Sequence, residues 1–250
     1  MKKALSVILI LVMAIAIFIT GTSCAKQKEA VLRVGTHAEY PPFEYKKGDE
    51  FAGVDMDIVK ALAEKMKIKY TIIDMDFDAL IPSLTSDKID LAISSITITE
   101  ERKKRIDYSA PYYTANQVIL AKTDFTQQIA KLEDLGQFRI GAQNGTTGQL
   151  YVNDNLVKKN LMDKKNLKKY SRLIESVTDL LNENIDFVIM DDSAARGYIK
   201  LKPLKIVYKI VTDEKYGIAL PKNSPYKARI NAALEELNKS GEIDSILARN

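Results

Sequence analysis

Hydroxyl-bearing residues and one arginine lie close together in residues 94–102, directly after a short apolar run. That run, residues 88–93, is too brief for a helix and rich in β-branched residues, which predicts a buried strand. Thr99, followed by two glutamates, is typical of a helix N-cap. The strand end, free backbone N–H groups and these side chains could together bind a carboxylate. The side chains are Ser94, Ser95, Thr97 and Arg102. The alternative is an ordinary strand-to-helix connection with a solvated arginine.

The apolar run has a counterpart in the second half of the chain. Ile89-Asp-Leu-Ala-Ile93 recurs as Ile185-Asp-Phe-Val-Ile189, and each is followed by polar residues. Open α/β sheets bind their ligands at the carboxyl ends of strands, so both sites are candidates. The second supplies Asp191. An anion-binding group opposite a lone carboxylate could bind the two charges of a free amino acid, whereas Asp191 could also be the solvated start of a helix.

Strands and helices alternate along the rest of the chain, which predicts an α/β protein. Strands are expected at residues 31–35, 69–75, 89–93, 118–122, 138–142, 168–170, 185–190, 205–211 and 216–220. A hairpin is expected at 45–51, and helices at about 55–67, 79–86, from 99, from 149, 175–181, from 193, and from 223 to the end with a break near residue 240.

Composition excludes several classes of function. The chain has 250 residues, 46% apolar and 28% charged, with a net charge of +4 to which Lys2 and Lys3 contribute. So small a charge predicts no nucleic-acid partner. One cysteine and one histidine exclude a disulfide framework and a zinc cluster. The glycine-rich loop at 143–148 lacks the Gly-Lys-Ser/Thr of a phosphate-binding loop, so a nucleotide-binding role is not expected. We expect no metal and no other cofactor.

The N-terminus is typical of a bacterial secretory signal. Lys2 and Lys3 precede an apolar run from Ala4 to Ile19, then small residues and Cys24. The pattern resembles a lipobox, with Gly21 where an aliphatic residue is usual. We expect a signal peptide at 1–23 and a lipidated tether at 24–30, placing the protein in the periplasm or at the cell surface, anchored through acyl chains on Cys24. An uncleaved anchor is the alternative, but the run is shorter than the ~20 residues of a membrane span.

Seven motifs together resemble the extracellular solute-binding protein family 3, the amino-acid-binding components of ABC importers. The resemblance covers nearly all of residues 31–250. The motifs lie at 35–44, 53–58, 77–84, 94–102, 107–112, 144–147 and 216–221. The resemblance implies a two-lobe periplasmic-binding-protein fold of type II. Its lobes would be residues 31–120 with 214–250 and residues 121–213, joined by hinge strands near 118–122 and 209–213, with the ligand cleft between them.

Carried over by position, the resemblance implies how an amino acid would be bound. Arg102 with the N–H groups of Ser95 and Thr147 would bind its α-carboxylate, helped by Thr97. Asp191, the Ser95 carbonyl and the Thr97 hydroxyl would bind its α-ammonium. The implied protein is a monomer that passes its ligand to an ABC permease and ATPase.

The ligand side chain would lie between Tyr40 and Phe77. The residues implied at its far end are His37, Ser94, Gln143 and Asn144. The two aromatic residues could instead be part of the core. His37 differs from family members with Asp at this position to bind a basic side chain, although Glu39 could restore a negative charge. The amino acid is therefore left open among polar, basic and small types.

Two other functions remain possible on the same fold. A few proteins of this fold resemble cyclohexadienyl dehydratases, which would need a catalytic acid in the cleft instead of an amine-binding Asp191. A ligand-sensing ectodomain would need a segment after Asn250 to transmit a signal, and we expect none.

Overall fold

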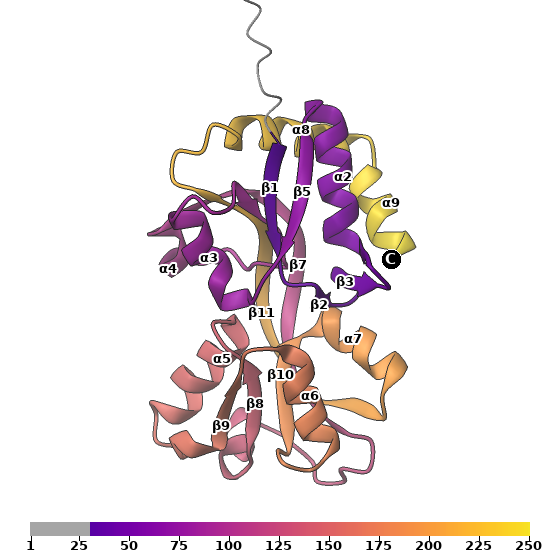
Figure 1. Cartoon of the computed structure of the whole chain (residues 1–250). Coiled ribbons are helices and arrows are strands. Elements are labelled where there is room, and N and C mark those ends of the chain that lie inside the picture. The colour runs from indigo at the N-terminus through magenta and orange to yellow at the C-terminus, as the bar shows by residue number, and fades with distance from the viewer. Residues whose placement is uncertain (1–30) are drawn as a thin grey trace, which may run out of the picture. The chain divides into compact units, whose positions relative to one another are not determined.

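Two long antiparallel strands, β7 (Ile106–Lys122) and β11 (Leu204–Pro221), run through the middle of an eight-stranded sheet (Figure 1). The computed structural model describes residues 31–250. The strand order is β5-β1-β6-β11-β7-β10-β8-β9. The other strands are β1 (Val31–Thr36), β5 (Lys69–Asp74), β6 (Leu91–Ala92), β8 (Ile140–Gln143), β9 (Leu167–Tyr170) and β10 (Phe187–Asp191). We call β1, β5, β6 and the helices beside them the first half, and β8, β9, β10 and theirs the second half.

A small three-stranded sheet and the helices complete the architecture. The small sheet contains β2 (Glu39–Tyr40), β3 (Glu44–Lys47) and β4 (Glu50–Ala52). The α-helices are α2 (Val54–Met66), α3 (Phe77–Thr85), α4 (Glu100–Lys103), α5 (Thr147–Val152), α6 (Leu173–Leu181), α7 (Asp192–Leu201), α8 (Lys227–Lys239) and α9 (Glu242–Arg249). Short helical turns are η1 (Leu132–Gln137), η2 (Asn153–Val157) and η3 (Lys164–Asn166). Within residues 31–250, no helix has the length and apolar character that a membrane span requires.

The order of strands is symmetrical about the β7–β11 pair. In each half the three strands outside that pair are parallel to one another. They are β5, β1 and β6 in the first half and β10, β8 and β9 in the second. The β7–β11 ladder is irregular between Ile210 and Glu214. There the side-chain oxygen of Asn116 accepts hydrogen bonds from the backbone N–H groups of Thr212 (3.0 Å) and Asp213 (3.1 Å). This irregularity lies where a hinge was expected.

An arginine–aspartate pair repeats in both halves and confirms that they are built alike. Arg33 binds Asp90 through Nε (3.0 Å) and Nη2 (2.7 Å), and Arg139 binds Asp186 through the same atoms at the same distances. Each aspartate also accepts the backbone N–H of its arginine, at 2.7 and 2.8 Å. The bidentate geometry therefore connects the first strand of each half to the Ile-Asp repeat found in the sequence.

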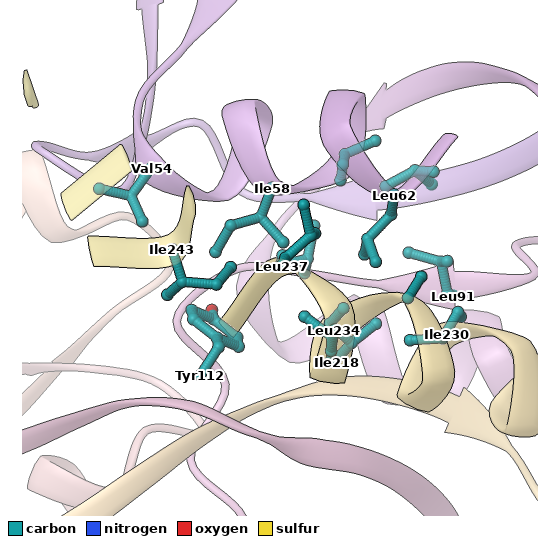
Figure 2. Packing of buried hydrophobic residues seen from close by; sticks show 14 of the residues in the cluster. Val54, Ile58, Leu62, Leu91, Tyr112, Ile218, Ile230, Leu234, Leu237 and Ile243 are labelled. Atoms are coloured by element: carbon teal, nitrogen blue, oxygen red, sulfur yellow. The ribbon is translucent and has the colours of Figure 1, made fainter. Parts of the chain in front are cut away.

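The apolar core of the first half is closed by three helices. Val54, Ile58 and Leu62 recur along one face of α2, as the helical spacing predicts, and all three are buried. Figure 2 shows these side chains packed against residues of α8, α9 and the strands. The partners labelled there are Leu91, Tyr112, Ile218, Ile230, Leu234, Leu237 and Ile243. Sequence positions near both ends of the chain thus form one core.

Candidate functional site

A cavity on the carboxyl-terminal side of several strands gathers almost all the residues predicted to bind a ligand. Its lining is His37, Tyr40, Glu44, Phe77, Ser94, Ser95, Thr97, Arg102, Gln117, Gln143, Thr146, Thr147, Gly148, Leu173, Ile189, Met190 and Asp191. Of the predicted set, only Asn144 is absent from this lining. Within residues 31–250 no group of His, Cys, Asp and Glu side chains is arranged to hold a metal ion.

Arg102 is held at the cavity by the short helix predicted from the sequence. The hydroxyl of Thr99 caps α4 by accepting the N–H of Arg102 at 3.2 Å. The guanidinium donates to the carbonyl oxygens of Thr97 (2.8 Å) and Gly145 (2.9 Å), and it lies over the ring of Phe77. Arg102 is only 9% exposed, and no acidic side chain of residues 31–250 forms an ion pair with it. Its charge is therefore available to an anion in the cavity.

Asp191 lies at the N-terminus of α7 and is buried. Its carboxylate accepts hydrogen bonds from the side-chain amide of Gln117 and the hydroxyl of Tyr216. Its backbone N–H donates to the hydroxyl of Tyr40 at 3.1 Å. Burial, and after it the charge of Glu214, raises the pKa of Asp191 to about 7. No lysine or arginine of the described residues pairs with it, so Asp191 is a buried acid without a cation.

Ser95 also lines the cavity, but its backbone N–H already donates to another residue. That N–H donates to Asp55 Oδ2 at 2.8 Å, and the Ser95 hydroxyl donates to Glu44 Oε2 at 3.0 Å. Ser95 has a φ of 49°, a left-handed backbone that few non-glycine residues adopt. The expectation that its N–H binds a ligand carboxylate does not fit this pattern, because Asp55 at the start of α2 takes the donor.

The carboxylate of Glu214, which was not among the residues predicted from the sequence, contacts Thr97 and Thr147. Glu214 Oε2 accepts hydrogen bonds from the hydroxyls of Thr97 (2.7 Å) and Thr147 (2.6 Å). Its other oxygen accepts from Gln117 Nε2 at 3.2 Å. Glu214 follows directly after the irregular part of β11, so the bulge decides where its side chain points. The two hydroxyls therefore form a site that holds a carboxylate group.

At the expected far end, His37 and Gln143 contact each other across the cavity. His37 Nδ1 lies 3.0 Å from the carbonyl oxygen of Met75, which can only accept, and Nε2 lies 2.9 Å from the amide nitrogen of Gln143, which can only donate. Glu39 does not line the cavity; its Oε1 pairs with Arg172, and its Oε2 lies 3.5 Å from His37 Nε2. Neither residue supplies a free negative charge to the cavity.

Asn144 is a correction to the predicted set. Its side-chain amide donates to Asp78 Oδ2 of α3 at 2.6 Å, and this contact is exposed. The backbone N–H of Asn144 donates to the carbonyl of Tyr170, which fixes the residue at the outer end of β8. Asn144 therefore connects the two halves beside the cavity and does not line it.

Several lining residues were not predicted from the sequence. These are Glu44, Gln117, Thr146, Gly148, Leu173 and Ile189. Gln117 was missed because residues 106–117 were not read as part of a strand; in the structure it pairs with Asp191 across β7 and β10. Glu44 was within a recognised motif, at the end of Pro-Pro-Phe-Glu, but its apolar neighbours gave no reason to expect a buried acid.

The two central strands, the symmetrical halves and the cleft lined by both define a two-lobe periplasmic-binding-protein fold of type II. Residues 32–250 match the model of the bacterial extracellular solute-binding proteins, family 3. The chain belongs to this family, and its curated relatives are named as binding proteins.

The most similar proteins found include named binding proteins. The arginine-binding extracellular protein ArtP of Bacillus subtilis is 34% identical over 233 residues, covering 91% of this chain and 87% of that protein. The structure of an ancestral arginine-binding protein bound to arginine has a TM-score of 0.82 and 40% identity, covering 88% of this chain and 97% of the other. The structure of the arginine-, lysine-, histidine-binding protein ArtJ of Geobacillus stearothermophilus has a TM-score of 0.80 and 35% identity, covering 88% of this chain and 94% of the other.

Proposed function

We propose that this protein captures a free amino acid with a polar or basic side chain and delivers it to an ABC permease and ATPase. One observation carries the proposal: buried Arg102 and buried Asp191 line the same cavity, and neither forms an ion pair within residues 31–250. Unpaired buried charges are costly, so a site that keeps two of opposite sign is suited to a dipolar ligand. The relatives named as arginine-binding proteins support the same class of ligand.

The clamp that we propose uses both lobes. Residues 31–120 with 214–250 form the first lobe and 121–213 the second, so that Arg102 and Asp191 come from different lobes. Arg102 and the Thr147 N–H bind the α-carboxylate, and Asp191 with the Ser95 carbonyl binds the α-ammonium. Tyr40 and Phe77 enclose the side chain. Ligand then stabilises the closed form because it contacts both lobes only when they are together.

Calorimetric titration of Arg102→Ala with amino acids tests the clamp. We expect a loss of about 2–5 kcal/mol in binding free energy, because a carboxylate remains buried without its partner. Arg105→Ala is the matched control, since Arg105 lies three residues away and is exposed; its affinity should equal that of the wild type. Near-normal binding by Arg102→Ala would refute the site.

We further propose that the mature chain is a monomer attached to the membrane by acyl chains on Cys24, which lies outside the described residues. Cys24→Ala should move the protein from the membrane fraction to the soluble fraction, and intact mass measurement should show the loss of the lipid. Equal membrane attachment of the variant would contradict the anchor.

A further inference from the structure

Glu214 bonds to one threonine hydroxyl from each half of the molecule. Its Oε2 accepts hydrogen bonds from Thr97 Oγ1 at 2.7 Å and from Thr147 Oγ1 at 2.6 Å. Both threonines line the cavity, whereas Glu214 does not and so lies behind them. The neighbouring Lys215 pairs with Asp213 at 2.9 Å, and no lysine or arginine within residues 31–250 forms an ion pair with Glu214. Its carboxylate is therefore held by uncharged donors and not by a cation.

The backbone fixes Thr97 beside Glu214. Residues 96–98 pair with residues 215–217 of β11 through two backbone hydrogen bonds, of 2.8 and 3.1 Å. Thr97 is 5% exposed, so its hydroxyl has little access to solvent and needs a partner inside the protein. The carboxylate that follows the irregular part of β11 is that partner.

The contact decides the direction of the Thr97 hydroxyl. An ionised carboxylate accepts hydrogen bonds and does not donate them, so the hydroxyl hydrogen must point to Glu214. The hydroxyl oxygen then keeps its lone pairs, and no other hydrogen bond of the described part of the chain uses this oxygen. An α-ammonium group can only donate. Glu214 therefore leaves Thr97 in the orientation that an ammonium group requires.

Gln117 connects Glu214 to the acid that we propose for the same ammonium. The amide nitrogen of Gln117 donates to Asp191 Oδ1 and also to Glu214 Oε1, the second at 3.2 Å. The two carboxylates thus share one amide donor. A cation that reaches Asp191 and the Thr97 oxygen would therefore be attracted by both, directly by Asp191 and through the threonine by Glu214.

We propose that Glu214 is a positioning residue for the ligand α-ammonium, because it binds the Thr97 hydrogen and leaves the oxygen free to accept from the ammonium. This inference rests on the proposed amino-acid clamp and adds to it a residue of the hinge strand that does not touch the ligand. The contact with Thr147 joins the two halves and favours the closed form for any ligand. Orientation of Thr97, in contrast, helps only a ligand that carries an α-amino group.

Glu214→Gln separates these two effects, because it keeps the shape of the side chain and reverses a hydrogen bond. Gln117 Nε2 is held by Asp191, so the oxygen of the new amide must face that nitrogen. The new amide nitrogen then faces the two threonines. It still bridges Thr97 and Thr147, but it donates to the Thr97 oxygen that the ammonium needs.

Calorimetry with three ligands measures the effect. They are L-arginine, its neutral isostere L-citrulline, and 5-guanidinopentanoate, which is arginine without the α-amino group; displacement titration covers weak binding. The titrations are done at pH 8, above the pKa of Asp191, which burial raises to about 7. In Glu214→Gln the affinities for arginine and citrulline should both fall by about tenfold or more, and the affinity for 5-guanidinopentanoate by less than about threefold.

Two further variants locate the effect. Asp213→Asn is the matched control, since it removes a carboxylate at the neighbouring exposed position, and all three affinities should equal those of the wild type. Thr97→Val should weaken arginine and citrulline but not 5-guanidinopentanoate. The double variant Thr97→Val/Glu214→Gln should lose no more affinity for arginine than Thr97→Val alone, because both changes act on one hydroxyl.

The outcomes separate the inference from the clamp on which it rests. Equal losses for all three ligands in Glu214→Gln, or additive losses in the double variant, overturn the positioning role and leave the clamp intact. If Glu214→Gln does not fold, an unchanged ratio of arginine to 5-guanidinopentanoate affinity in Thr97→Val overturns that role by itself. A wild type that binds neither arginine nor citrulline overturns the clamp as well.

Discussion

Asp191 shows how one residue links ligand binding to pH. Its acid form is favoured by burial and by the charge of Glu214, which together raise its pKa to about 7. In the unfolded chain the same group ionises near pH 4. Between about pH 4 and 7 the folded ligand-free protein therefore binds a proton that the unfolded chain has lost, so this group's contribution to stability falls as pH rises through that window.

Ligand affinity should have the opposite pH dependence. An α-ammonium pairs with ionised Asp191, so citrulline affinity should rise up to about tenfold per unit as pH increases toward 7 and then level off. Tyrosine fluorescence titrations from pH 5 to 8.5 measure this dependence, and citrulline avoids any effect of ligand side-chain charge. Asp191→Asn should bind weakly with a flat profile. A wild-type affinity that does not vary below pH 7 would contradict the proposed role.

At the scale of elements, the start of α2 depends on Gly53. This residue has a φ of 113°, and an added Cβ would lie 2.3 Å from the carbonyl oxygen of Phe43. That carbonyl and the one of Pro42 accept the first N–H groups of the helix, from Asp55 at 2.8 Å and Val54 at 3.0 Å. The backbone at Phe43 and Pro42 therefore cannot move away from a side chain at position 53 without losing the hydrogen bonds to the first N–H groups of α2.

Gly53→Ala should therefore lower the free energy of unfolding by about 3 kcal/mol or more, the sum of backbone strain and a clash with main-chain atoms. Gly48→Ala is the matched control: Gly48 also has a positive φ, of 65°, but nothing lies within 4 Å of its added Cβ. Its cost should be about 1 kcal/mol. Urea denaturation measures both, and equal costs would show that the contact with Phe43 does not matter.

Local signals in the sequence predicted most elements, including most of β11, but only the end of the central strand β7. Thr99 was correctly predicted as an N-cap, and α2, α3, α6 and the break between α8 and α9 lie close to their predicted positions. Only residues 118–122 of β7 were predicted, because Pro111, Asn116 and other polar residues interrupt the apolar pattern. Pairing with β11 and β10 decides that strand, and such long-range contacts leave no local pattern.

At the scale of the whole molecule, the repeated half explains both what the sequence showed and what it hid. Counting from the two aspartates of the arginine–aspartate pairs, Ser95 and Asp191 occupy the same position in their halves, five residues beyond Asp90 and Asp186. The same position thus supplies the hydroxyl of Ser95 in one half and the carboxylate of Asp191 in the other. The two sides of the cavity therefore differ in charge at this position. The repeat was visible in the sequence, but the contacts of Glu214 with Thr147 and of Asn144 with Asp78 depend on how the halves meet.

Asn144→Ala tests whether this residue serves closure or ligand recognition. Its amide reaches Asp78 in the other half and does not line the cavity. Its loss should weaken the closed form, so that affinities for arginine and citrulline fall by the same factor, about two- to fivefold for one exposed hydrogen bond. Asn155→Ala is the matched control, because its amide bonds to the Tyr151 carbonyl within one half; affinity should not change. If Asn144 instead contacted the ligand side chain, as its sequence position suggested, the ratio of the two affinities would change, and calorimetry with both ligands distinguishes the outcomes.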